Sequence, residues 1–212
     1  MPSVPNPLAD EIDRRIEASP DHRTVAIRRI RREYSQRLQP APPGEVLDVA
    51  DALVERRRWV AYELVHHHPG ALAALDRETV TRLGRGLDSW GAVDAFGRYV
   101  SGPAWRLGRI PDAAVHEWAR SPDRWWRRAA LVSTVPLNLR AAGGTGDAER
   151  TLAVCAQLVC DRDDMVVKAL SWALRELIVW DPEAVRSFLA GHDLAPRVRR
   201  EVTTKLETGR KR

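Results

Sequence analysis

Trp172 lies in a segment, 163–179, whose apolar residues follow a helical period. At about 100° per residue, the apolar stripe is centred about 180° from Trp172. Its members are Val166, Val167, Leu170, Leu174, Leu177 and Ile178. Lys168 and Arg175 flank the tryptophan on the outer face. Such an aromatic either packs on a neighbouring helix and covers surface through cation–π contacts, or forms a platform beside phosphate-binding charges.

Trp90 shows the same pattern in segment 90–100. On a regular helix the core face would consist of Ala92, Ala95, Phe96 and Tyr99. Trp90 would then point away from the core, with Asp94 one turn further along. Gly91 and Gly97 lack side chains and would let the backbone of a ligand approach closely. The pair is therefore a candidate for chemistry, and the alternative is that Asp94 forms a salt bridge with an arginine.

The basic residues are almost all arginine and are clustered. Lysine and arginine together number 34, against 29 acidic residues, which gives a net charge of +5. The arginines either reflect a GC-rich genome or provide a planar, bidentate grip on phosphate. Segment 22–37 has six arginines against Glu33, and segment 195–212 has seven basic residues against two glutamates. Clustered positive charge of this kind is typical of a polyanion-binding protein. Arg128 belongs either to such a phosphate-binding face or to a solvated one.

The elements that must position these residues are short helices. Turn signals are frequent, and no alternation long enough to predict a strand is present. Residues 123–129 and 163–169 both read as Asp, four residues, a base and Ala, at an offset of 40. That period is typical of HEAT repeats and favours a solenoid over a helical bundle. Residues 1–7 and 209–212 are expected to be flexible.

Several other classes of function are not supported. The three consecutive histidines, 66–68, fan around a helix axis and cannot converge on one ion, so no metal site is predicted. The glycine-rich segment 143–146 lacks the ending of a phosphate loop. No apolar run is long enough to span a bilayer, and no signal peptide is expected. Cys155 and Cys160 are expected to be free, buried thiols of a cytoplasmic protein.

Three ordered motifs within residues 47–206 resemble the HEAT-like alkylpurine DNA glycosylases, the AlkD-like DNA alkylation repair enzymes. The first is Ser-Trp-Gly-Ala-Val-Asp at 89–94. The second combines Trp-Ala-Arg-Ser at 118–121 with Trp-Arg-Arg-Ala-Ala at 126–130. The third is Lys-Ala-Leu-Ser-Trp-Ala-Leu-Arg-Glu at 168–176, which Asp-Pro follows at 181–182. The resemblance implies an all-α, HEAT-like helical-repeat solenoid with a concave basic groove, formed by residues 1–212 as one domain.

The resemblance also implies site residues and an activity. By motif, Trp90, Asp94 and Trp172 correspond to the active site of the family, and Arg128 to an arginine that contacts phosphate. Further contacts to DNA are expected from Arg127, Lys168, Arg175, Arg197, Arg199, Arg200 and Lys205. The implied reaction is hydrolysis of the N-glycosidic bond of N3- or N7-alkylated, cationic purines, with the Asp94 carboxylate stabilising the sugar cation. No lyase lysine is evident, which predicts a monofunctional glycosylase.

The expected partner is double-stranded DNA that contains alkylated bases. The protein is expected to be a monomer without a cofactor, associated with the nucleoid through DNA. One departure from the family is the short N-terminal region, 1–39, whose only aromatic residue is Tyr34. Two alternatives stay open at this stage. One is a non-catalytic DNA-binding HEAT-repeat protein, and the other is a protein-binding helical scaffold in which Trp90 and Trp172 anchor a partner.

Overall fold

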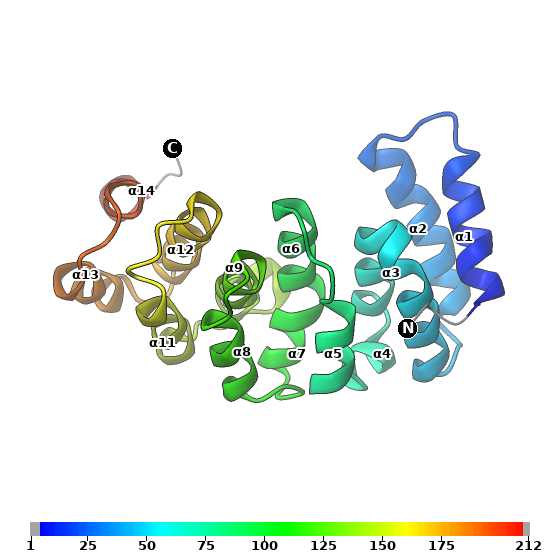
Figure 1. Ribbon diagram of the computed structural model, residues 1–212, viewed down its shortest axis with the longest axis horizontal. Helices are drawn as coiled ribbons and strands as arrows, with labels where there is room; N and C mark the ends of the chain where they lie inside the picture. The colour runs from blue at the N-terminus through cyan, green and yellow to red at the C-terminus, as the bar shows by residue number, and fades with distance from the viewer. Residues whose placement is uncertain (1–4, 210–212) are drawn as a thin grey trace. The chain divides into compact units, whose positions relative to one another are not determined.

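The computed structural model describes residues 5–209, and this part of the chain is all-helical, with no strand (Figure 1). This confirms the all-α part of the predicted fold class. The chain divides into two compact units, 1–86 and 87–212. Within residues 5–209, no helix combines the length and the apolar character that are needed to cross a membrane.

The first unit consists of helices around the long helix α3. Their bounds are α1 Pro7–Glu17, α2 Thr24–Leu38, α3 Pro43–His66, α4 Pro69–Ala73 and α5 Arg77–Leu83. Helix α3 packs against each of the other four, and α1 also packs against α2. Proline occupies the start of α1, α3 and α4, where its missing N–H costs no helical hydrogen bond. Ile12, Ile30 and Leu53 are buried where α1, α2 and α3 meet.

The start of the first unit differs from the sequence prediction. Residues 1–7 were expected to be flexible, but Pro7 already lies in α1 and Asn6 caps it, because its Oδ1 accepts the backbone N–H groups of Leu8 and Ala9 at 3.1 Å. Residues 1–4 and 210–212 lie outside the described residues. The histidine run falls at a helix end as expected: α3 ends at His66, and His68 caps α4.

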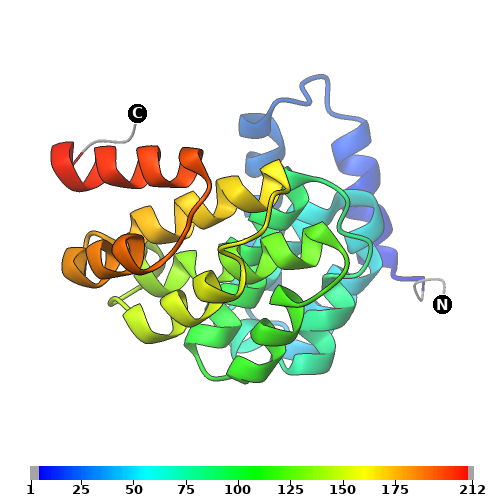
Figure 2. The ribbon, with the colours of Figure 1, turned by 60° about the vertical axis from the view of Figure 1, so that its left-hand side comes forward.

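The second unit contains the candidate site. Its elements are α6 Trp90–Phe96, a π-helical turn Gly97–Ser101, α7 Gly102–Arg106, α8 Asp112–Ala119, α9 Arg124–Ser133, α10 Val135–Asn138, a 3₁₀ turn Arg140–Ala142, α11 Ala148–Gln157, α12 Asp164–Leu177, α13 Pro182–Gly191 and α14 Pro196–Thr208. Helices α6, α9, α12 and α14 form a row in which each packs against the next. Figure 2 shows α14 lying beside α12 at one end of that row.

The internal repeat corresponds to equivalent helices of this row. Asp123 and Asp163, which are 40 residues apart, both cap a helix: their Oδ1 atoms accept the N–H of Trp125 and of Met165, each at 2.9 Å. The capped helices, α9 and α12, pack directly against each other. The repeat therefore marks structurally equivalent positions.

Segment 90–100 is not the regular helix that the sequence analysis assumed. Helix α6 ends at Phe96, and a π-helical turn follows. The buried residues are Val93, Ala95, Phe96, Gly97 and Val100, whereas Ala92 and Tyr99, which were expected in the core, are only half-buried. The core direction is therefore rotated relative to the prediction, and Trp90 points sideways from it rather than directly away.

Gly97 does not leave room for a ligand, as had been expected. A Cβ atom at this position would lie 2.5 Å from Cγ1 of Val132, so the glycine allows the π-helical turn to pack closely on α9. Gly91 is exposed, and a Cβ atom there would have no neighbour within 4 Å. Of the two cysteines, Cys155 is buried as predicted, but Cys160 is exposed; both are free.

Candidate active site

Asp94 and Arg128 form an ion pair between α6 and α9. Oδ1 of Asp94 accepts two hydrogen bonds from Arg128, one from Nη2 at 2.7 Å and one from Nε at 3.0 Å. The third donor group of the guanidinium, Nη1, donates to the carbonyl oxygen of Met165 in α12. Arg128 therefore connects three neighbouring helices of the row. Of the two sequence interpretations of Asp94, the structure shows the salt bridge, which leaves the proposed chemical role open.

Arg128 is buried and Asp94 is partly accessible. Arg128 is 5% exposed, so it does not lie on a solvated face. The side chain of Asp94 is 21% exposed. Burial raises the pKa of Asp94 above its ordinary value of 3.8, while the nearby Arg128 guanidinium, and Arg98 more weakly, act to lower this pKa. The pair thus holds a carboxylate at the border of the core with its charge compensated on one side.

The two oxygens of the Asp94 carboxylate differ. Both Arg128 donors bind Oδ1, and within residues 5–209 no hydrogen bond to Oδ2 is present. Trp90 lies one turn earlier on the same helix and is 61% exposed. Among the exposed large hydrophobic residues of the described chain, it is the aromatic one. Asp94 and Trp90 therefore present a carboxylate oxygen and an indole from adjacent turns of α6.

An aromatic cluster supports α6 and α9 beneath this pair. Trp118 of α8 lies 5.2 Å from Trp126 of α9, and Phe96 of α6 lies 6.0 Å and 5.9 Å from them, measured between ring centroids. Sequence analysis had not singled out this cluster. Because Phe96 follows Asp94 by two residues, packing of its ring fixes the orientation of α6 relative to α9.

The other predicted residue of α9 is also engaged within the protein. Nε of Arg127 donates to Oδ2 of Asp161 at 2.6 Å, and its Nη1 donates to the carbonyl oxygens of Ser121 and Pro122. The side chain of Arg127 is 21% exposed. It ties α9 to the loop that leads into α12, and a phosphate would have to compete with Asp161 for it.

Trp172 is half-buried on α12, and the apolar stripe of this helix is largely as predicted. Val166, Val167, Leu170, Leu174 and Leu177 are buried, and Ile178 is half-buried. The indole Nε1 of Trp172 donates to Oε1 of Glu176 at 2.9 Å. Lys168, one turn before it, is paired with Asp164 through an Nζ–Oδ2 distance of 2.6 Å. Trp172 therefore lies among charged side chains outside the buried stripe, as expected.

Glu201 of α14 connects this helix to α12 through a hydrogen bond. Its Oε2 accepts the hydroxyl of Ser171 at 2.6 Å, and its Oε1 accepts Nε of Arg197 at 2.8 Å. Arg175 folds back, with its Nε donating to the carbonyl oxygen of Ser171 at 3.1 Å. Burial alone would raise the pKa of Glu201, but Ser171 and the two arginines outweigh it, and the pKa is lowered. Local sequence patterns gave no signal for this cluster, because its members are about 30 residues apart.

The remaining predicted contacts lie on α14. Arg199 donates to the carbonyl oxygens of Leu189 and His192, which close the end of α13. Lys205 donates to the carbonyl oxygen of Gly209 at 2.8 Å. Arg200 is exposed, and it has no ion-pair partner among the described residues. The basic residues after Gly209 lie outside the described residues. No group of three or more metal-ligating side chains is found within residues 5–209.

The row α6, α9, α12 and α14 therefore carries all the predicted site residues. Asp94 and Arg128 are brought into direct contact, whereas Trp90 and Trp172 lie on α6 and α12, which Arg128 links. None of the curated proteins matches this sequence. A family model described as DNA alkylation repair enzyme matches residues 22–206, which is most of the chain and includes the entire row up to Leu206. The chain therefore belongs to the DNA alkylation repair enzyme family.

Proposed function

We propose that this protein is a monofunctional DNA glycosylase that excises N3- or N7-alkylated purines from double-stranded DNA. Membership of a DNA alkylation repair enzyme family supports a role in DNA repair. The observation that carries the finer proposal is the Asp94 carboxylate, which is held through Oδ1 by a buried arginine and leaves Oδ2 without a hydrogen bond from residues 5–209. We propose in addition that the helices form a HEAT-like solenoid with a concave basic groove, as a monomer.

The proposed chemistry requires a fixed negative charge. Alkylation at N3 or N7 makes the purine cationic, so it departs as a neutral base and leaves positive charge on the sugar. A pre-oriented carboxylate beside that sugar lowers the barrier because it is already in place when the charge develops. Oδ2 of Asp94 is the atom that we assign to this role, and it can also orient the water that attacks the sugar carbon.

Arg128 is proposed to position this carboxylate. The motif alone would place Arg128 on a DNA phosphate, but its donors already bind Asp94 and Met165. A contact to phosphate remains a prediction and would require this pair to separate. A guanidinium that binds one carboxylate oxygen anchors that oxygen and favours the ionised form against the effect of burial, which supports the electrostatic role.

Trp90 and Trp172 are proposed to face the cationic nucleotide from both sides of Asp94. Arg128 reaches the backbone of α12 at Met165, and Met165 and Trp172 are separated by seven residues. Seven residues are about 20° short of two helical turns, so both lie on the same side of α12. Cation–π attraction to each indole would contribute about 0.5–2 kcal/mol.

The surroundings of Lys168 support hydrolysis rather than lyase chemistry. A lysine that forms a Schiff base must lose its proton and be free to attack. Lys168 instead forms an ion pair with Asp164 at 2.6 Å, so its Nζ is already engaged within α12. Water activated near Asp94 is therefore the proposed nucleophile, and an intact abasic site is the proposed product. No cofactor is required for this reaction.

Binding to DNA is proposed to use the basic residues of the row α6, α9, α12 and α14. These are Arg127, Arg128, Lys168, Arg175, Arg197, Arg199, Arg200 and Lys205. Most of them have intramolecular partners, so we expect phosphates to exchange with those partners at Arg127, Lys168 and Arg197. Arg200 is the exposed member that needs no such exchange.

Release of free base from methylated duplex DNA tests the proposal directly. The expected result is liberation of 7-methylguanine or 3-methyladenine with the abasic strand left uncleaved. A protein that binds duplex DNA with steep salt dependence but releases no base would instead be a non-catalytic DNA-binding protein. Absence of both activities would favour a protein-binding scaffold, in which Trp90 anchors a partner.

A further inference from the structure

Helix α2 of the first unit has a basic outer face that the proposed reaction does not use. Its buried residues are Ile30, Arg31, Tyr34, Ser35 and Leu38. At about 100° per residue, the direction opposite to this buried side falls within about 50° of five exposed residues. These are Val25, Arg29, Arg32, Glu33 and Gln36.

Arg29 and Arg32 have no ion-pair partner on this face, because its acidic residue, Glu33, pairs with Arg15 at 3.5 Å. No carboxylate of residues 5–209 lies within 4 Å of either guanidinium. The charge of Arg29 contributes weakly to lowering the pKa of Asp21, but the carboxylate of Asp21 is already paired with Arg23 at 2.9 Å. Neighbouring like charges three residues apart oppose helix formation. Their placement on α2 is therefore not explained by the stability of the helix.

Arg28 and Trp59 extend the basic face to one side. The guanidinium of Arg28 lies 5.0 Å from the ring centroid of Trp59, which is half-buried on α3. Arg28 makes only a long contact of 3.6 Å with Glu63, because the other oxygen of that carboxylate binds the buried Arg31 at 2.7 Å. The side chain of Arg28 is 45% exposed, so it can turn toward an external anion.

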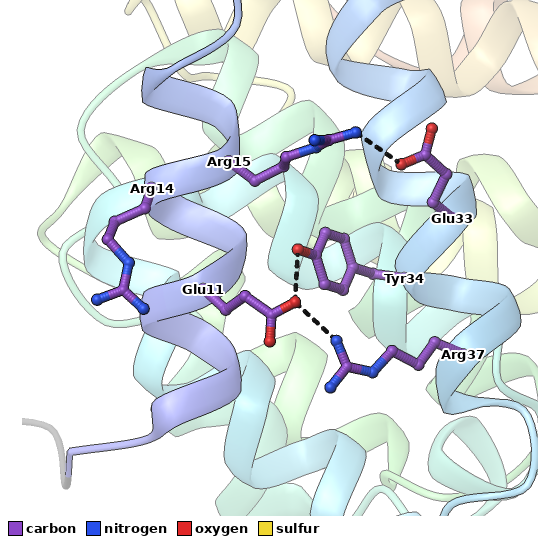
Figure 3. Close-up of a pocket in the computed structure, with 6 residues that line it drawn as sticks. All are labelled: Glu11, Arg14, Arg15, Glu33, Tyr34 and Arg37. Carbon is purple, nitrogen blue, oxygen red and sulfur yellow. Dashed lines mark hydrogen bonds and ion pairs between the residues drawn. The ribbon is translucent and has the colours of Figure 1, made fainter.

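The other side of α2 is different, because most of its charged side chains are paired with one another. A cleft of about 550 Å³ between α1 and α2 is lined by Glu11, Arg14, Arg15, Glu33, Tyr34 and Arg37. Figure 3 shows that Arg37 and Tyr34 both point to Glu11, while Arg15 points to Glu33. Both glutamates of the cleft are thus paired and Arg14 adds one further positive charge, whereas on the outer face neither Arg29 nor Arg32 has an ion-pair partner among residues 5–209.

We infer that Arg28, Arg29 and Arg32 form a second binding surface for the phosphate backbone of duplex DNA, carried by the first unit. Arginine side chains on one exposed helix face, with an aromatic ring beside them, complement a row of phosphates. The inference rests on the proposed function only for the identity of the polyanion. The surface contributes affinity that does not depend on sequence or damage, and it takes no part in breaking the glycosidic bond.

The test compares two double variants of the full chain in binding to an undamaged duplex of about 20 base pairs. Arg29→Ala with Arg32→Ala should make the slope of log affinity against log salt less steep by about 2, because each lost phosphate contact removes about 0.9. The matched control is Arg109→Ala with Arg120→Ala. It removes the same charge from two exposed arginines of the second unit that have no ion-pair partner among the described residues.

The expected outcome is a lower affinity and slope for the α2 variant and a slope for the control that changes by well under 1. Base release from methylated duplex at saturating enzyme should be unchanged. An α2 variant that binds duplex DNA like the wild type would overturn the inference. Loss of binding to phosphatidylglycerol vesicles with unchanged DNA binding would also overturn it, in favour of a membrane partner. Absence of base release would refute the proposed reaction and leave this measurement intact.

Discussion

Asp94→Asn isolates the charge of the proposed catalytic carboxylate. Asparagine has the same size, and its Oδ1 can still accept Nη2 and Nε of Arg128, which lie 2.7 and 3.0 Å away in the wild type. The negative charge is lost, and an amide NH2 group takes the place of Oδ2. If that charge stabilises the developing sugar cation, base release should fall by about 10² or more, which corresponds to about 2.7 kcal/mol of transition-state stabilisation. Affinity for DNA should be unchanged or higher, because a negative charge has left a phosphate-binding site.

A double-mutant cycle with Arg128→Ala then shows whether Arg128 acts through Asp94. A positioning residue has nothing left to position once the charge of Asp94 is gone. Arg128→Ala should therefore reduce base release strongly in the wild type and by less than about 10-fold in the Asp94→Asn background, because contacting residues are not additive. An independent phosphate contact would instead give effects that multiply, together with a salt slope that is less steep by about 1.

Stability must be measured alongside, because Arg128 is 5% exposed. Breaking a buried ion pair by removing one partner costs about 3–5 kcal/mol. Arg128→Ala should be at or below that range, since Asp94 is 21% exposed and can be partly rehydrated. Asp94→Asn should cost less, because the hydrogen bonds to Arg128 remain. Single-turnover base release below the melting temperature of each variant, with spontaneous depurination subtracted, is the appropriate assay. Full activity of folded Asp94→Asn would refute the reasoning.

Three further predictions concern the same helices. Burial raises the pKa of Asp94 above 3.8 while Arg128 lowers it, so activity should fall as pH drops through the raised pKa, and the acid limb of the pH–rate profile should move to higher pH in Arg128→Ala. Trp90→Ala should change the free energy of unfolding by less than about 0.5 kcal/mol, since this side chain is 61% exposed, yet it should reduce both base release and binding of damaged duplex. Gly97→Ala should destabilise by about 1–3 kcal/mol, because the added Cβ would lie 2.5 Å from Val132. Gly91→Ala is its control in thermal melts and should be neutral or stabilising, since that position is open.

Sequence patterns predicted best what is determined locally. The repeat at an offset of 40 correctly marked Asp123 and Asp163, because a side-chain cap involves residues only two positions apart. The buried stripe of α12 was also largely correct, since this helix is regular over 14 residues and its period is not interrupted. In both cases the physical cause lies within one or two turns of helix.

The predicted core face of segment 90–100 was wrong for a reason that a periodic pattern cannot show. Within α6, the packing of this helix on α9 buries Val93 rather than Ala92, and from Gly97 onward a π-helical turn moves residues away from the places that a regular helix predicts. This turn begins at Gly97, where close packing on Val132 favours it. Gly97 itself was the visible signal, but it was interpreted as space for a ligand rather than as close contact between helices.

The partners of the arginines could not be predicted because they are distant in sequence. Arg128 pairs with a residue 34 positions before it, and Arg127 with one 34 positions after it. In a chain with 34 basic and 29 acidic residues, composition alone allows many such pairs. Net charge therefore overestimates how many arginines are free to bind DNA. The packing of α9 between α6 and α12 determines that Arg127 and Arg128 are paired within the protein.

The geometry at Arg128 explains why arginine rather than lysine suits this position. Its planar guanidinium donates from Nε and Nη2 to one carboxylate oxygen of α6 and from Nη1 to a carbonyl oxygen of α12, in a single rigid fork. An ammonium is a compact charge and could not define both directions together. The orientation of Asp94 is thus determined by the contact of three helices, so a change in the packing of any one of them would move the oxygen to which we assign the chemistry.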